Sequence, residues 1–115
     1  TFSVQFAANF LTENWSRDCL PDPFIILKDG LSRPLHRSEV VLSAQGCISW
    51  EAIRINTSRM DPSGLVVVEL WMCMRPSGNQ LIGTAVTDAY TLLQGPAWDF
   101  SDPSKGMTAR VWVAA

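Results

Sequence analysis

Short segments in which apolar and polar residues alternate recur along the whole chain. Phe2, Val4 and Phe6 alternate with polar or small neighbours, as in a strand with one buried face. Seven further segments have the length and composition of strands, namely 24–27, 39–42, 48–55, 66–71, 80–86, 98–100 and 108–113. Turn-forming Gly, Pro, Asn and Asp residues separate nearly every pair. The pattern predicts an all-β fold, an eight-stranded antiparallel β-sandwich.

Segment 66–71 is continuously apolar apart from Glu69, which is typical of a central strand. Trp50 and Trp71 fall within strand patterns, so both are expected to be substantially buried. Helical structure is predicted only over 87–93, as a short turn that Asp88 caps.

Composition places the chain among single globular domains. It has 115 residues, of which 47% are hydrophobic and 17% charged, and its net charge is -2. A mildly acidic chain with only two lysines does not suggest nucleic acid as a partner. No apolar run is long enough to span a bilayer. Because the sequence starts at Thr1 without a methionine, we expect residues 1–115 to be one domain of a larger protein.

The three cysteines, Cys19, Cys47 and Cys73, cannot all pair within one chain, and their spacing indicates neither a zinc site nor a redox motif. An odd number of thiols suits a reducing compartment. We therefore expect a cytoplasmic location, with cytoskeletal or membrane association left open.

No catalytic constellation is apparent. A hydrolytic triad would have to use His36, the only histidine, and no nucleophile elbow occurs near a serine. Asp18, Asp22 and Asp29 lie in one region and have the oxygen ligands that a cation needs, but turn and capping roles are the more common use of such residues. We expect no enzyme activity, no cofactor and no metal.

The order of the segments resembles that of C2 domains, the β-sandwich family named after the second conserved region of protein kinase C. The first segment, 4–11, is similar to the family's first strand, and Pro21-Asp22-Pro23-Phe24 to its Asp-Pro-Tyr strand entry. The strongest segments are 65–71, which resembles the family's Glu-Val-Trp strand, and 80–85, which resembles its Leu-Ile-Gly sequel. The resemblance covers nearly the whole chain and implies the circularly permuted type II topology.

The calcium ligands of the family are largely missing at the matching positions. Asp22 matches one first-loop aspartate, but Ser16 stands at the other, although Asp18 is close. The Asp-x-Asp of the third loop is replaced by Met72-Cys73-Met74, and a later aspartate by Gln80. Calcium needs six to eight oxygen ligands, and thioether sulfur does not supply them. The resemblance therefore implies a C2-like domain that works without calcium.

Two functions remain after this comparison. In the first, the domain docks a protein partner and targets a larger cytoskeletal, ciliary or signalling protein, through a loop surface formed by Trp15, Leu20, Met72, Met74 and Arg75. The methionines have an alternative role, as filling at the top of the core. In the second function, the domain binds anionic lipid weakly, with Arg33, Arg37, Arg54 and Arg59 as the candidate residues. The protein-partner interpretation is preferred because Glu39 and Glu51 dilute the basic charge.

Overall fold

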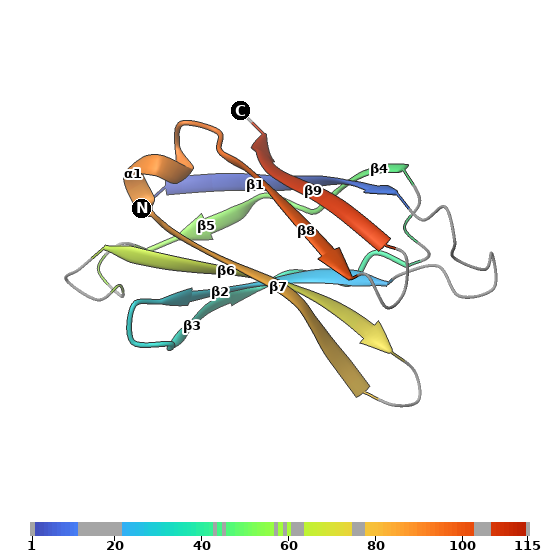
Figure 1. The fold of residues 1–115 in the computed structure, drawn as a ribbon. Helices are drawn as coiled ribbons and strands as arrows, with labels where there is room; N and C mark the ends of the chain where they lie inside the picture. The colour runs from blue at the N-terminus through green and yellow to red at the C-terminus, as the bar shows by residue number, and fades with distance from the viewer. Residues whose placement is uncertain are drawn as a thin grey trace.

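Two antiparallel sheets face each other in the computed structural model of the chain (Figure 1). The structure describes residues 2–11, 22–42, 44, 46–56, 58, 60, 64–74, 78–102 and 107–114. In chain order, its elements are β1 (Phe2–Leu11), β2 (Pro23–Asp29), β3 (Pro34–Arg37), β4 (Gly46–Ser49), β5 (Ile53–Ile55), β6 (Leu65–Met74), β7 (Gly78–Asp88), α1 (Ala89–Leu92), β8 (Ala97–Asp102) and β9 (Met107–Ala114). The predicted all-β sandwich is confirmed.

One sheet has the strand order β4-β1-β9-β8, with β5 also pairing to β1, and the other has the order β3-β2-β6-β7. The last strand, β9, thus lies between the first strand and β8, so segments from both ends of the chain meet in one sheet (Figure 1). Along β1, Val4, Phe6, Ala8 and Phe10 point into the core. They pack against residues of the facing sheet, among them Ile25, Leu27, Val66, Val68 and Leu70.

The strand predicted over 48–55 is interrupted at Trp50. Between the pairs Val4–Ile53 and Ala7–Ser49, β1 advances by three residues and its partner segment by four, so one extra residue is inserted. The Trp50 side chain is buried in the core, and its indole Nε1 donates to the Pro23 carbonyl at 3.3 Å. The interruption therefore divides one predicted strand into β4 and β5.

The prediction of a strand at 39–42 is wrong, because the strand beside β2 is formed instead by Pro34–Arg37. The ladder between β2 and β3 ends at Arg37, and the next residue, Ser38, hydrogen-bonds to backbone groups through its side chain. The buried Ser38 Oγ accepts the backbone N–H of Ile25 at 2.8 Å and donates to the Glu39 carbonyl at 2.9 Å. A serine hydroxyl that bonds the neighbouring backbone in this way competes with regular pairing.

β6 and β7 form a longer hairpin than the sequence indicated. Their ladder runs from Leu65–Asp88 to Met74–Gly78 and has one register shift beside Leu70. Most of the predicted third loop, 72–80, is therefore strand. β6 is the central strand that the sequence predicted, although its outward-facing residues Val67 and Trp71 are only half-buried.

The predicted helical turn is confirmed as α1. Asp88 is its N-cap, and the Asp88 carboxylate accepts the Thr91 backbone N–H at 2.7 Å. This hydrogen bond holds the pKa of Asp88 below its ordinary value, because it stabilises the charged form. No helix among the described residues has the length and apolar character needed to cross a membrane.

Candidate functional site

Most of the predicted loop surface lies outside the described residues. This applies to Trp15, Leu20 and Arg75, and also to Arg59 of the candidate lipid-binding set. For Met74 the structure gives only the backbone, which ends β6 opposite Gly78. The contact between these residues stays a prediction.

Met72 does not belong to an exposed surface. Its side chain is 1% exposed and belongs to the same core cluster as Leu70, so it has the alternative role of filling the core. The physical reason is that the alternation of β6 continues past Trp71, which turns Met72 inward.

The candidate lipid-binding arginines do not gather on one face. Arg37 lies at the end of β3, and Arg33 lies in the turn that precedes β3, whereas Arg54 lies on β5 in the other sheet. Arg33 is also paired with Asp29, since its Nε lies 2.7 Å from the Asp29 Oδ2. Arg33 and Arg54 line one small hollow beside the β2–β3 turn, whereas Arg37 lies over Phe24, so the three described arginines do not form one basic patch.

A different cluster occupies the outer face of the β3-β2-β6-β7 sheet. Phe24 and Trp71 are cross-strand partners on β2 and β6, and their neighbours Ile25 and Leu70 point into the core, so both rings lie on the outer side. The two rings stack, with centroids 6.3 Å apart and an interplanar angle of 13°. Phe24 is nevertheless completely buried, because its neighbours on this face cover it.

Charged side chains complete this cover. The Arg37 guanidinium lies over the Phe24 ring, 4.4 Å from its centroid, in a cation–π contact. Glu69 Oε1 accepts the Trp71 indole Nε1–H at 3.0 Å and lies 3.2 Å from the Lys28 ammonium. One carboxylate thus holds both the tryptophan and the lysine, and Arg37 is left as the cation without a carboxylate partner among the described residues of this face.

Exposed aliphatic residues extend the cluster along β7. Leu81 pairs with Trp71 and Val86 pairs with Val67, which places both on the outer face. Leu81 is 43% exposed and Val86 is 64% exposed. We define the outer-face cluster as Phe24, Lys28, Arg37, Glu69, Trp71, Leu81 and Val86.

Sequence reasoning missed this cluster, apart from Arg37, which it had assigned to lipid binding. The alternation of side chains along each strand could have indicated the cluster. Phe24 and Trp71 each stand next to a residue that must face the core, so both must face outward. The contact between the two rings also depends on the register of β2 against β6, which the sequence alone does not reveal.

Comparison with known proteins identifies which known fold this architecture matches. No family model matches the sequence, and no curated protein does. Solved structures do match. One titled "BON1-C2B" has a TM-score of 0.68 and 14% identity over 96% of this chain and 87% of its own. Another, titled "Structure of a C2 domain", has a TM-score of 0.53 and 12% identity over 97% of this chain and 99% of its own.

The chain has the C2 fold. At these identities the likeness concerns the architecture alone, and it confirms the C2-like sandwich that the sequence resembled. What a C2 domain does depends on the side chains that it carries.

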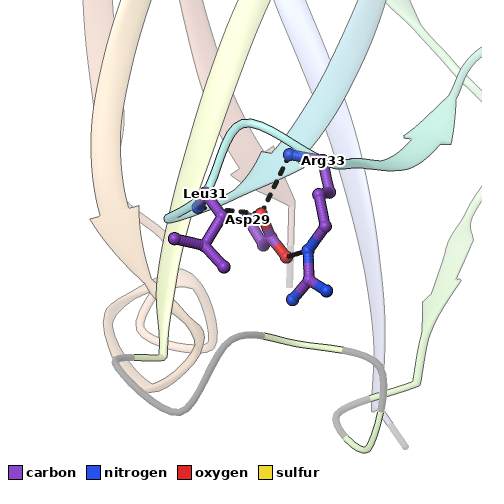
Figure 2. Close-up of polar contacts among 3 residues, drawn as sticks. All are labelled: Asp29, Leu31 and Arg33. Carbon is purple, nitrogen blue, oxygen red and sulfur yellow. Dashed lines mark hydrogen bonds and ion pairs between the residues drawn. The ribbon is translucent and has the colours of Figure 1, made fainter.

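The acidic residues of the chain occupy separate positions. Asp29 is enclosed in the β2–β3 turn, where it accepts hydrogen bonds from Leu31 and Arg33 (Figure 2). The Asp22 carbonyl accepts the Cys73 N–H at 2.9 Å, next to the start of β2. Within the described part of the chain, no three His, Cys, Asp or Glu residues gather as a metal site. The Asp29 carboxylate is engaged within the β2–β3 turn and not in a cation site with Asp22, and Asp18 lies outside the described residues.

The single histidine stands apart from these acids. His36 is half-buried on β3 opposite Leu27, and it makes no hydrogen bond to another described side chain.

Proposed function

We propose that this C2 domain is a calcium-independent interaction module that docks a protein partner through the outer-face cluster. The observation that carries the proposal is the stacked Phe24–Trp71 pair, held on the outside of the sandwich by Arg37 and Glu69. Tryptophan and arginine are the residues most often found as interface hot spots. Here both are fixed in place before a partner arrives, which lowers the entropy cost of binding.

The chemistry of the face indicates the chemistry of the partner. Leu81 and Val86 offer exposed aliphatic contact area on one side, and Arg37 offers a cation on the other. The matching surface presents apolar side chains next to a carboxylate. We therefore propose a protein partner with an acidic, partly apolar patch, because such a patch would pair with Arg37 as it covers the aliphatic residues.

Charge on this face argues against a lipid surface as the main ligand. Glu69 compensates Lys28, so the outer-face cluster carries a single surplus positive charge, on Arg37. Each basic residue near an anionic membrane contributes about 1 kcal/mol, which is too little for stable anchoring here.

The β6–β7 hairpin supports calcium independence. The family's aspartate positions match Met72, Cys73 and Met74, and in this chain all three lie in the ladder with β7. Met72 points into the core, where a cation has no access. Cys73 is half-buried, and its thiol is a poor ligand for calcium. This arrangement offers no carboxylate at the three positions.

A capture experiment with paired variants tests the proposal. The immobilised chain is incubated with cell extract in EGTA, and the polypeptides that it retains are compared with those of Arg37→Glu/Val86→Asp. The matched control is Arg110→Glu/Leu93→Asp, which makes the same changes at exposed positions away from the cluster. Parallel co-sedimentation with phosphatidylserine vesicles tests the lipid alternative.

We expect the same polypeptides to be retained by the wild type and the control and to be lost from the outer-face variant, with no vesicle binding. Equal retention by both variants would contradict the docking face. Polypeptides that are retained only when calcium replaces EGTA would contradict calcium independence. Vesicle binding that Arg37→Glu/Val86→Asp removes would show that the face recognises lipid instead.

A further inference from the structure

One edge of the β3-β2-β6-β7 sheet is a long strand whose outer side is unpaired. β7 is the last strand of that sheet, and its ladder with β6 runs from Asp88 to Gly78 (Figure 1). Every second residue of an edge strand points its backbone N–H and C=O groups away from the sheet. Among the described residues, no backbone group outside β6 hydrogen-bonds to β7. This side of β7 can therefore accept one more strand.

The other edge strands have features by which natural proteins protect a sheet edge. β3, β4 and β5 have only three or four residues each, and β3 starts at Pro34, which has no N–H to donate. β8 carries two negative charges, on Asp99 and Asp102. β7, in contrast, has 11 residues, and neither proline nor a charged residue occurs from Gly78 to Thr87. Its edge is thus long and uncharged, where the others are short or charged.

A bulge limits the regular part of this edge. β7 has one extra residue, Ile82, at the register shift beside Leu70. A bulge twists an edge strand and interrupts further pairing. Beyond it the ladder is regular from Gly83 to Asp88, a span of ordinary strand length. We define the free edge as residues 83–88.

Side chains of the free edge alternate between the two faces of the sheet. Ala85 pairs with the core residue Val68 and faces the core. Thr84 and Val86, on either side of it, face outward. Val86 is 64% exposed although it pairs with Val67 on β6, because no described strand covers its other side. An added strand would cover that side and bury the exposed valine.

We propose that the free edge pairs with the same edge of a second copy of the chain, as two antiparallel strands related by a two-fold axis. Such a contact is isologous and joins the two four-stranded sheets into one continuous sheet. The two-fold axis keeps outward-facing residues on one face of the joint sheet. The row formed by Thr84 and Val86 in one copy therefore lies against the same row in the other.

Charge favours a second copy as the occupant of this edge. Like charges directly opposite each other destabilise strand pairing, and residues 83–87 carry no charge that could repel a second copy. Asp88 stands at the end of the free edge, so antiparallel pairing places the two Asp88 carboxylates at opposite ends of the joint ladder. Each Asp88 is also already engaged as the N-cap of α1. An uncharged edge thus gives a charged foreign segment nothing to recognise, whereas it matches itself.

Sedimentation equilibrium of the 115-residue chain tests the proposal, with the chain concentration varied from about 1 to 500 µM. A contact between two short strands belongs to the small interfaces that form weak, transient complexes. We expect the average mass to rise from 12.7 kDa toward twice that value over this range. The measurement needs no other polypeptide, so its outcome is independent of the docking function proposed for the outer-face cluster.

A variant and a matched control identify the edge. Thr84→Lys/Val86→Lys places two positive charges on each side of the joint ladder, and lysines on an edge block strand addition. It should raise the dissociation constant by at least about tenfold. Its melting temperature should stay near that of the wild type, because both positions are exposed. The control, Thr108→Lys/Leu42→Lys, adds the same charges at exposed positions outside β7 and should self-associate like the wild type.

Hydrogen exchange of the ¹⁵N-labelled wild type locates the contact without a substitution. Every second amide over residues 83–88 should exchange more slowly at high chain concentration, in proportion to the fall in the monomer fraction, since only alternate N–H groups point to the free side. A chain that keeps the monomer mass throughout overturns the proposal. So does a dimer in which these amides gain no protection, or in which the lysine pair on β7 has no more effect than the control.

Discussion

Gly83 on β7 lies directly beneath the Phe100 ring, and this contact sets how closely β8 approaches the β6–β7 hairpin. A methyl group added at Gly83 would overlap Cδ1 of Phe100 and lie 2.9 Å from both Cε1 and Cγ of the same ring. Carbon atoms in contact prefer about 3.5–4.0 Å. Phe100 is buried, so its ring has little room to withdraw. Gly83→Ala is therefore expected to overpack the space between the two sheets.

The magnitude follows from two opposing effects. Overpacking a well-filled core costs about 1–3 kcal/mol. Replacing glycine by alanine restricts the unfolded chain and returns about 0.4–1 kcal/mol. Because the added methyl group would overlap the Phe100 ring, the upper part of the overpacking range applies, and the net destabilisation should be about 1–2 kcal/mol. For a domain of this size, each kcal/mol lowers the melting temperature by about 4 °C. We therefore expect a decrease of about 4–8 °C.

Thermal and urea unfolding followed by tryptophan fluorescence measure this effect. Thr84→Ala is the control, since Thr84 is exposed next to Gly83 and should change stability little. Combining Gly83→Ala with Phe100→Leu should relieve part of the clash, so the two changes should cost less together than the sum of their separate effects. A Gly83→Ala variant as stable as the wild type, or strict additivity with Phe100→Leu, would refute the packing argument.

Two further predictions concern the β2–β3 region. Ser38→Ala should lower the free energy of unfolding by about 1–3 kcal/mol in urea, because the buried Ile25 N–H loses its acceptor; an effect no larger than that of the exposed Ser49→Ala would contradict this. Asp29→Asn should lower the melting temperature at pH 7. Because the folded pKa of Asp29 lies below the ordinary 3.8, its stabilisation is present above that pH and disappears as pH falls through the folded pKa. The difference from the wild type should narrow in melts below about pH 4, and a difference independent of pH would argue against an ionised Asp29.

Local patterns in the sequence predicted much of the fold. The alternation of Phe2, Val4 and Phe6 placed the core face of β1, and Asp88 marked the start of α1. In both cases the deciding interaction lies within a few residues of the signal. The continuation of β6 was also readable, because Met72 stands two residues after the core residue Leu70.

The errors arose where a distant partner decides the structure. Ser38 ends β3 by bonding to Ile25, and Trp50 interrupts a strand by filling the core beside Pro23. Neither residue type is a strand breaker by itself, so composition and periodicity gave no warning.

The proposed docking site shows the same dependence on register. The outer-face cluster forms because β2 and β6 pair Phe24 with Trp71. Its side chains come from segments that the sequence separates, and the sheet brings them together.

Calcium independence separates the proposed function from that of a calcium-switched C2 domain, and a melting experiment tests it most directly. The 115-residue chain is heated in EGTA and in increasing calcium up to millimolar concentration. A ligand that binds only the folded state raises its stability in proportion to RT ln(1 + [L]/Kd). The structure predicts one melting temperature at every calcium concentration, because no carboxylate stands at Met72, Cys73 or Met74. A saturable rise that Asp22→Asn abolishes would contradict it.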